Sequence, residues 1–590
     1  MRIGVRCVHF LRSKRNKSHK KARHLVLNSY LYALKLIKMK FRTLLILALL
    51  PFGALRAQTA AQPAEQTKQP RLIVNIVVSQ MRYDFLSRFE KGFGEGGFKR
   101  FMREGTSYEE SYYNYMLTTT PASLATLTTG ANPSIHGVAA DYWVDYTTNR
   151  KVALIDDRSM RGLDCDDGRG CYSNANLVVP TFADALKDYS PDSRVVTLAC
   201  DPMSAVVMGG KTSDVYWIDD SRCCWATSTA YKPMLPGWVS DYNDERYNAS
   251  FLNYKWTLLN DKDVYVNRRY SRLEPVKATE QPSKKRSALS RMFTKQTISR
   301  DYDKILSTPA GNTIVFEFAR RAMMNERLGA DEVTDVLNIC LDAPRYIGEM
   351  YGPESMEIED MFYRLDSDLE QFLGFVFAQF DSSEEVLVVL TSDHGSSDSY
   401  DLGDEPRERF NPRQFCVILN SFMIAQWGAG DWVLDYVDRQ LYLNRNLIYS
   451  KNLNLEEVQN RVAAFALQFR GVSHVMTSTA MQNSYFGASY AQMMQNSFYP
   501  RRSGDLTINL MAGWIEERDD DEARSRSGSM YGYDTHVPML WLGWKVPAAR
   551  KVYRSVDMTS VAPTLARIVN IGRPIASTSL PLEEIIGADK

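Results

Sequence analysis

An aspartate and a histidine stand side by side where an apolar run of the sequence ends. Val386–Thr391 is a β-branched run typical of a buried strand, and the residues SDHG follow it directly. A carboxylate beside an imidazole offers the oxygen and nitrogen donors that zinc binds. We therefore predict that Asp393 and His394 are metal ligands, with a purely structural Asp-His-Gly turn as the alternative interpretation.

The surrounding pattern predicts an α/β fold. Apolar runs resembling buried parallel strands alternate with amphipathic helical segments, and such alternation favours a sheet with helices on both faces. In these folds ligands bind at the carboxyl ends of the strands, which is where Asp393 and His394 stand. The expected strands are Arg71–Ser79, Ser193–Leu198, Val336–Leu341, Val386–Thr391 and Pro538–Leu542, and the expected helices are Thr181–Lys187, Gly311–Asn325, Ser355–Phe375 and Asn454–Phe469.

The N-terminus predicts an exported protein. From Met39 the chain reads MKFRTLLILALLPFGALRAQ, a basic start, a short apolar run and a small residue before the cleavage point, as in a secretory signal peptide. We interpret residues 1–38 as a misassigned start, 39–57 as the signal peptide, 58–70 as a linker and 71–590 as one domain with insertions near 200–300 and 400–530. No stretch has the roughly 20 apolar residues that a membrane span needs. The predicted location is the periplasm or cell envelope, or the medium.

Charge argues against nucleic acid as a partner. The first 57 residues hold fourteen Lys or Arg and no acid, which leaves 57 basic against 70 acidic residues in the rest of the chain. Phosphate backbones are bound by clustered cations, which a net-acidic body does not favour. Two charge-rich stretches, Ser283–Arg300 and Glu516–Arg526, are interpreted as solvated loops.

Ordered motifs along nearly all of the mature chain resemble the alkaline phosphatase superfamily, in particular bacterial secreted phosphatases with a threonine nucleophile and two zinc ions. The resemblance rests on MRYD at 81–84, PSIHG at 133–137, PAGNT at 309–313, SDHG at 392–395, YDTHVP at 533–538 and APTLA at 562–566. It implies a central mixed, mostly parallel sheet with helices on both faces and cap insertions. It places the nucleophile at Thr120, although in LTTTPAS this hydroxyl can also cap the following helix.

The resemblance also shows which metal ligands this sequence lacks. One metal of the family is held by an Asp at the end of the first strand, the threonine and the Asp-His pair; here Asp393 and His394 match, but Ser79 replaces the first acid. The second metal is held by an Asp, a His four residues later and a distant His. His536 matches the distant one, whereas Arg345 and Glu349 replace the other two. A protonated guanidinium has no lone pair for a metal.

The phosphate-holding positions are altered as well. By the same resemblance, an Asn, a Lys and an Arg of the family fall on Asp141, Asp201 and Met203. These replacements remove positive charge and add negative charge around the site of a phosphate dianion. Only four histidines follow the signal peptide, so few imidazoles remain for zinc, while carboxylates still suit magnesium or calcium.

Two hypotheses follow. The first is a pseudophosphatase, catalytically impaired or inactive, that acts in the envelope as a scaffold or binding protein for an unknown protein partner, with Arg345 pairing with Glu349 in place of the missing metal. The second is an active phosphate mono- or diester hydrolase that works through Thr120 with one zinc retained, or with magnesium or calcium. Diesters and sulfate esters carry less charge than a phosphate monoester and tolerate the lost cations better.

Overall fold

The computed structural model describes residues 69–166, 168–267, 302, 305–400, 409–518 and 523–587. The predicted start extension and signal peptide, most of the predicted linker and Ser283–Arg300 lie outside the described residues. Within the described ranges, no helix has the length and apolar character needed to cross a membrane.

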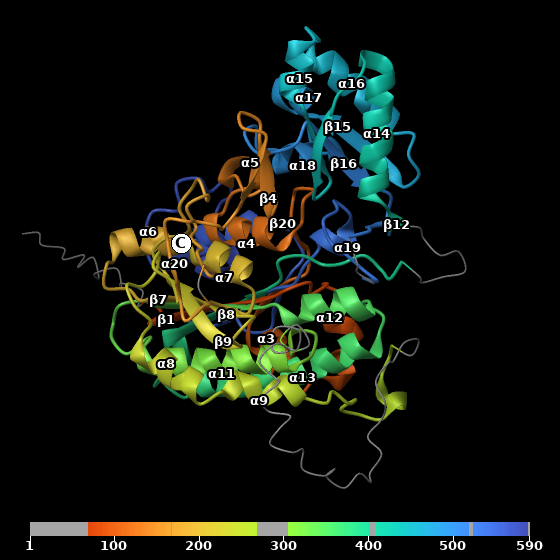
Figure 1. Ribbon diagram of the computed structural model, residues 1–590. Coiled ribbons are helices and arrows are strands. Elements are labelled where there is room, and N and C mark those ends of the chain that lie inside the picture. Colours follow the sequence, from red (N-terminus) through yellow and green to blue (C-terminus); the bar gives the residue numbers. More distant parts are fainter. Residues whose placement is uncertain are drawn as a thin grey trace, which may run out of the picture. The chain divides into compact units, whose positions relative to one another are not determined.

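The centre of the fold is a ten-stranded mixed sheet (Figure 1). Its inner strands β8, β7, β10, β1 and β11 run parallel, and β18 pairs antiparallel with β11. The strands in spatial order are β19 (Arg550–Val552), β2 (Thr106–Tyr108), β18 (Met539–Gly543), β11 (Val386–Thr391), β1 (Leu72–Val78), β10 (Asp335–Leu341), β7 (Val195–Ala199), β8 (Asp214–Asp219), β9 (Cys224–Ser228) and β6 (Gly162–Leu163).

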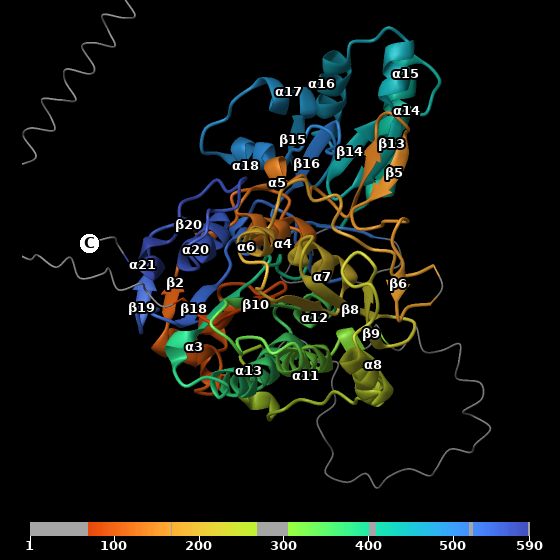
Figure 2. The same ribbon diagram turned by 90° about the vertical axis from the view of Figure 1, so that its left-hand side faces the viewer.

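Both faces of this sheet are buried, because successive residues of a strand point to opposite sides. In β1, Leu72, Val74 and Ile76 join one apolar core, and Ile73 and Val77 join the other. The first core packs against α11 (Ala310–Asn325) and α13 (Met356–Phe377), and the second against α4 (Thr120–Thr129), α6 (Phe182–Tyr189), α7 (Pro202–Gly209) and α20 (Val561–Ile568). The two helix layers lie on opposite sides of the sheet (Figures 1 and 2).

A second, four-stranded antiparallel sheet has a core of its own. Its strands, in spatial order, are β13 (Val433–Val437), β14 (Gln440–Leu443), β16 (Leu506–Leu510) and β15 (Val472–Thr477), and α14 (Pro412–Trp427), α15 (Arg445–Ser450) and α16 (Leu455–Ala466) pack with it. Shorter helices α17 (Ser478–Asn483) and α18 (Tyr490–Ser497) follow β15. We call residues 409–518 the cap.

These elements confirm the α/β class predicted from the sequence. Each of the five predicted strands and four predicted helices overlaps an observed element, with ends that differ by at most three residues. The cap falls within the insertion expected near 400–530, while the predicted domain boundaries themselves stay predictions.

Candidate active site

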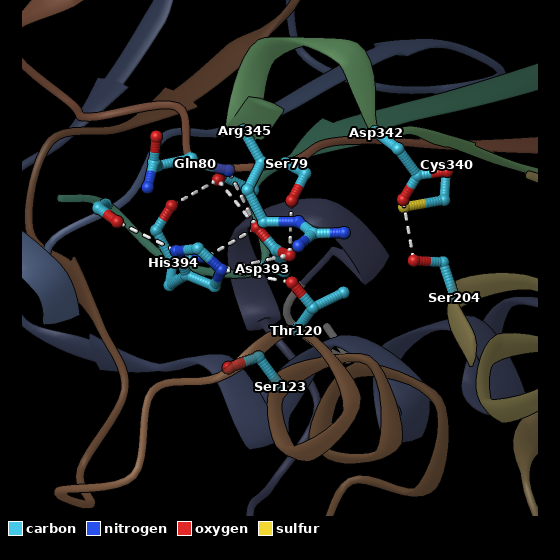
Figure 3. Close-up of polar contacts among 12 residues, drawn as sticks. Ser79, Gln80, Thr120, Ser123, Ser204, Cys340, Asp342, Arg345, Asp393 and His394 are labelled. Atoms are coloured by element: carbon cyan, nitrogen blue, oxygen red, sulfur yellow. Dashed lines mark hydrogen bonds and ion pairs between the residues drawn. The ribbon is translucent and has the colours of Figure 1, made fainter. Parts of the chain in front are cut away.

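Parallel strands bring the candidate residues to one edge of the sheet. Ser79 follows β1, Asp393 and His394 follow β11, and Asp342 follows β10. Because these strands are neighbours and run the same way, their carboxyl ends meet. Thr120 reaches the same place as the first residue of α4 (Figure 3).

The Asp393 carboxylate is held entirely by protein donors. The Ser79 hydroxyl donates to its Oδ2 at 2.7 Å. The backbone N–H groups of Gln80 and His394 donate to Oδ1 at 2.9 and 2.8 Å. Asp393 has no exposed surface, so these charge-assisted bonds offset the cost of burying its charge. Ser79 is therefore a hydrogen-bond donor that fixes the Asp393 carboxylate.

His394 and Thr120 are in direct contact. The His394 Nδ1 lies 2.8 Å from the carbonyl oxygen of Gly395, and because a carbonyl only accepts, Nδ1 carries the proton. The Nε2 lone pair is then free to accept the Thr120 hydroxyl, whose Oγ1 lies 3.1 Å away. This tautomer orients the threonine oxygen toward the imidazole, as Figure 3 shows.

The first metal position keeps three suitably spaced donors. His394 Nε2 lies 3.4 Å from Asp393 Oδ2 and 3.1 Å from Thr120 Oγ1. A tetrahedral zinc with ligands at about 2.0–2.1 Å separates its ligand atoms by roughly 3.3–3.4 Å. Both distances from His394 Nε2 are close to this separation, so these residues would suit one zinc ion, which when bound would acidify the threonine hydroxyl. No group of three or more His, Cys, Asp or Glu in the described part of the chain is arranged to hold a metal.

By the resemblance, a second metal position of the family falls on Arg345, and a guanidinium has no lone pair for a metal. Arg345, on α12 (Ala343–Tyr351), pairs with Asp201 at 2.9 Å. Burial opposes its charge, but the Tyr346 hydroxyl, Asp201 and Glu349 hold the pKa of Arg345 above its ordinary value. No chemical step can run through a metal at this position while the ion pair is intact.

The predicted pairing of Arg345 with Glu349 is wrong. Glu349 lies one helical turn further along α12 and pairs with Arg526 at 3.4 Å. Asp201, at the N-cap of α7, also accepts from the backbone N–H of Met203 at 2.9 Å. Asp201 is thus the counter-ion of Arg345.

A further carboxylate, Asp342, lies beneath this pair. It accepts from the backbone N–H of Asp201 at 2.9 Å and from the Ser204 hydroxyl at 2.6 Å. Burial and repulsion from Asp201 raise the pKa of Asp342 to about 7. The residue was not predicted to belong to the site, although it directly follows the predicted strand Val336–Leu341.

A pocket of about 90 Å³ with both acids and arginines in its wall lies here, lined among others by Thr120, His394, Asp201, Arg345 and Glu349. Four guanidiniums and five carboxylates of the described chain line it. The ion pairs across it are Arg345–Asp201, Arg526–Glu349, Arg518–Asp438 and Arg439–Glu516, with nitrogen–oxygen distances of 2.9, 3.4, 3.2 and 3.9 Å.

The interpretation of Glu516–Arg526 as a solvated loop is therefore wrong at its ends. Glu516 and Arg526 are 8% and 6% exposed, and both line the pocket with Arg518 and Ser527. The alternation of acids and arginines in this stretch was the only sequence signal for them, and it equally fits a surface loop.

Asp141 and Met203 line the same pocket. Asp141 is exposed at the mouth of the pocket. Desolvation by the surrounding protein and repulsion from the Asp438 carboxylate raise the pKa of Asp141. Apart from His536, all the predicted site residues are thus gathered at one edge of the sheet, but no cation of this chain stands at the three positions expected to hold phosphate.

His536 lies outside the pocket. Its ring is stacked between Tyr83 and Tyr112, with ring centroids 4.2 and 4.5 Å away, and its Nε2 donates to the Glu109 carbonyl at 2.9 Å. The prediction that His536 is a retained ligand position does not agree with this placement, since Ser527 and Gly528 line the pocket instead.

Comparisons with known proteins agree with this architecture. The sequence model of the family described as type I phosphodiesterase/nucleotide pyrophosphatase matches residues 73–534. The chain is 28% identical to alkaline phosphatase PhoV of Synechococcus elongatus, covering 93% of this chain and all of the relative. It is 30% identical, with the same coverage, to a protein of Myroides odoratus named calcium-transporting ATPase. The crystal structure of alkaline phosphatase PafA superposes with a TM-score of 0.79 at 26% identity, covering 88% of this chain and 99% of PafA.

Proposed function

This chain belongs to the type I phosphodiesterase/nucleotide pyrophosphatase family of the alkaline phosphatase superfamily, and we propose that it is a pseudophosphatase. In this proposal it keeps the fold and the pocket, lacks the two-metal chemistry, and acts in the periplasm or cell envelope as a ligand-binding or scaffold protein. The chain still carries Thr120 where the family places its nucleophile.

The Arg345–Asp201 ion pair carries this proposal. By the resemblance to the family, Arg345 falls at a metal-ligand position and Asp201 at a phosphate-holding position, and the structure pairs these two side chains. Two zinc ions would lie against a guanidinium, and a phosphate dianion would lie against Asp201 and Asp141. Both arrangements are repulsive at short range in a partly dry pocket.

A second candidate function is an impaired hydrolase with one metal. The observation that favours it is the spacing of Thr120 Oγ1, His394 Nε2 and Asp393 Oδ2, which suits a single zinc ion. Thr120 would then be the nucleophile and His394 would orient it. The names of the relatives PhoV and PafA, both called alkaline phosphatases, also support this candidate.

Metal content and turnover decide between the two. The mature chain is purified without chelator, and its zinc, magnesium and calcium are measured by plasma mass spectrometry. Hydrolysis of para-nitrophenyl phosphate and of bis-para-nitrophenyl phosphate is compared with that of Thr120→Ala. The pseudophosphatase proposal expects less than one metal per chain and no activity that depends on Thr120. Stoichiometric zinc together with a rate lost in Thr120→Ala would support the one-metal hydrolase instead.

A further inference from the structure

The cap delivers two charged residues to the pocket on a tight hairpin. β13 and β14 pair with Val437 opposite Gln440, so Asp438 and Arg439 form a two-residue turn. Both have positive φ, 43° and 63°. Turns with two positive φ values favour Asn-Gly, and a residue with a long side chain is strained in this conformation. Strain of this kind concentrates at functional sites.

The Arg439 guanidinium is buried, and one of its nitrogens has no hydrogen-bond acceptor among the described residues. The residue is 4% exposed and lines the pocket together with Thr120. Its Nη1 has no hydrogen-bond partner among the described residues. Its nearest acid, Glu516, lies 3.9 Å from Nε and already accepts from the Tyr436 hydroxyl. A buried guanidinium held by one loose ion pair is costly unless another acceptor is present.

Two other donors in the pocket are also without an acceptor in the described chain. They are Arg345 Nε and the Thr119 hydroxyl oxygen. Thr119 is the N-cap of α4 but makes no capping bond with its side chain. The positive end of the α4 dipole faces the same space. Three unmet donors and a helix N-terminus around one pocket call for an anionic acceptor.

The charge of the pocket limits that anion. Five carboxylates face four guanidiniums along the described lining, so the wall itself carries a small negative excess. The electrostatic repulsion between the pocket wall and a doubly charged anion is about twice that with a singly charged anion. A singly charged anion can still accept hydrogen bonds from the guanidinium donors.

The space beside the pocket has room for the rest of such a ligand. A cavity of about 690 Å³ adjoins the pocket and shares Asp141, Asp438, Glu516 and Arg518 with it. Its other lining groups include Lys151, Asp435 and Asn411. A polar body fits this lining better than an apolar one.

We propose that Arg439 is a binding and specificity-determining residue that holds a singly charged oxyanion, such as a diester or a carboxylate, over Thr120, with the polar body of the ligand in the adjoining cavity. This deepens the proposed function and rests on it, because the cations of the cap then replace the cations that the family places elsewhere. The binding needs no bond to break.

Calorimetric titration tests the assignment. Bis-para-nitrophenyl phosphate serves as the singly charged diester, para-nitrophenyl phosphate at mildly alkaline pH as the doubly charged monoester, and benzoate as the carboxylate. The proposal expects the diester or benzoate to bind more tightly than the monoester. It expects Arg439→Gln to weaken that binding by about tenfold or more, and Arg439→Lys to recover part of it because the positive charge is kept.

A matched control separates binding from turn strain. Asn452, on the α15–α16 connection of the same cap, also has a positive φ, 55°, and does not line the pocket. Asn452→Gly should leave all three affinities unchanged. Equal affinity of wild type and Arg439→Gln, with both folded by circular dichroism, would overturn the proposal, and so would tighter binding of the monoester. Neither result depends on zinc content or turnover, which test the proposed function.

Discussion

The Arg345 guanidinium pairs with the Asp201 carboxylate at 2.9 Å, across 144 residues of sequence. By the family resemblance, we predict that Arg345 falls at a metal-ligand position and Asp201 at a phosphate-holding position. Each change alone would leave an uncompensated charge near Asp342 and Asp393. Together the two side chains form a neutral ion pair, so the charge of each one compensates the charge of the other.

The first prediction is that these two residues are energetically coupled. Arg345→Met keeps most of the side-chain volume but leaves Asp201 beside the buried Asp342 without a cation. Both partners are about one-fifth exposed, so we expect a loss of about 2–3 kcal/mol rather than the 3–5 kcal/mol of a fully buried pair. Urea denaturation of Arg345→Met, Asp201→Asn and the double variant measures it. We expect a coupling of about 1 kcal/mol or more between the two substitutions in the free energy of unfolding. Strictly additive effects on the free energy of unfolding would contradict this prediction.

The sequence was sufficient for the fold because its strands are continuous apolar runs. Strands such as Val386–Thr391 are buried on both faces, so nearly all of their residues are apolar. Such strands can be recognised from the local sequence alone. It also located Ser79, Asp393 and His394, since residues that end neighbouring parallel strands meet wherever the sheet forms.

The cap residues of the site could not be predicted in the same way. Asp438 and Arg439 reach the pocket only because an antiparallel hairpin of the cap ends there, and their sequence neighbourhood resembles an exposed turn. His536 shows the opposite error, since YDTHVP matches the family but the Tyr83 and Tyr112 rings enclose the imidazole at another place. Arg345 was identified, but its partner was assigned to the near acid on its own helix rather than to Asp201.

A second prediction concerns pH and the buried His136. Its Nδ1 accepts from the Val138 N–H at 3.1 Å, and its Nε2 lies 3.1 Å from Thr126 Oγ1, which donates to the Ala122 carbonyl. Both nitrogens are used by the neutral ring, and burial lowers the pKa of His136 to about 3. The unfolded chain, with a pKa near 6.5, binds this proton first.

Stability should therefore fall as pH decreases from about 6.5 toward 3, by up to roughly 1.4 kcal/mol per pH unit from this group. His136→Gln cannot titrate there, so we expect it to be less stable than wild type at neutral pH but to lose less stability on acidification. Urea midpoints measured between neutral pH and about pH 4.5 give the two slopes. Parallel slopes would show that this imidazole does not contribute.

The third prediction is that zinc binding can be restored one site at a time. In the wild type, the Ser79 hydroxyl donates to the Asp393 carboxylate at 2.7 Å. Ser79→Asp therefore places a second carboxylate beside Asp393. The two carboxylates repel each other without a metal, so this variant should melt at a lower temperature in chelator and at a higher temperature in zinc. Adding Arg345→Asp, Glu349→His and Asp201→Asn rebuilds part of the second position and removes the acid left unpaired.

We expect this combination to bind about one zinc ion per chain, since His536 is outside the pocket and cannot complete the second position. Ser527 and Glu349 both line the pocket, so Ser527→His on the same background should bring the zinc content toward two. Plasma mass spectrometry after dialysis measures both, and His394→Ala in each background should lower the count. Two zinc ions before Ser527→His is added would mean that the chain completes the second position with a residue other than Ser527.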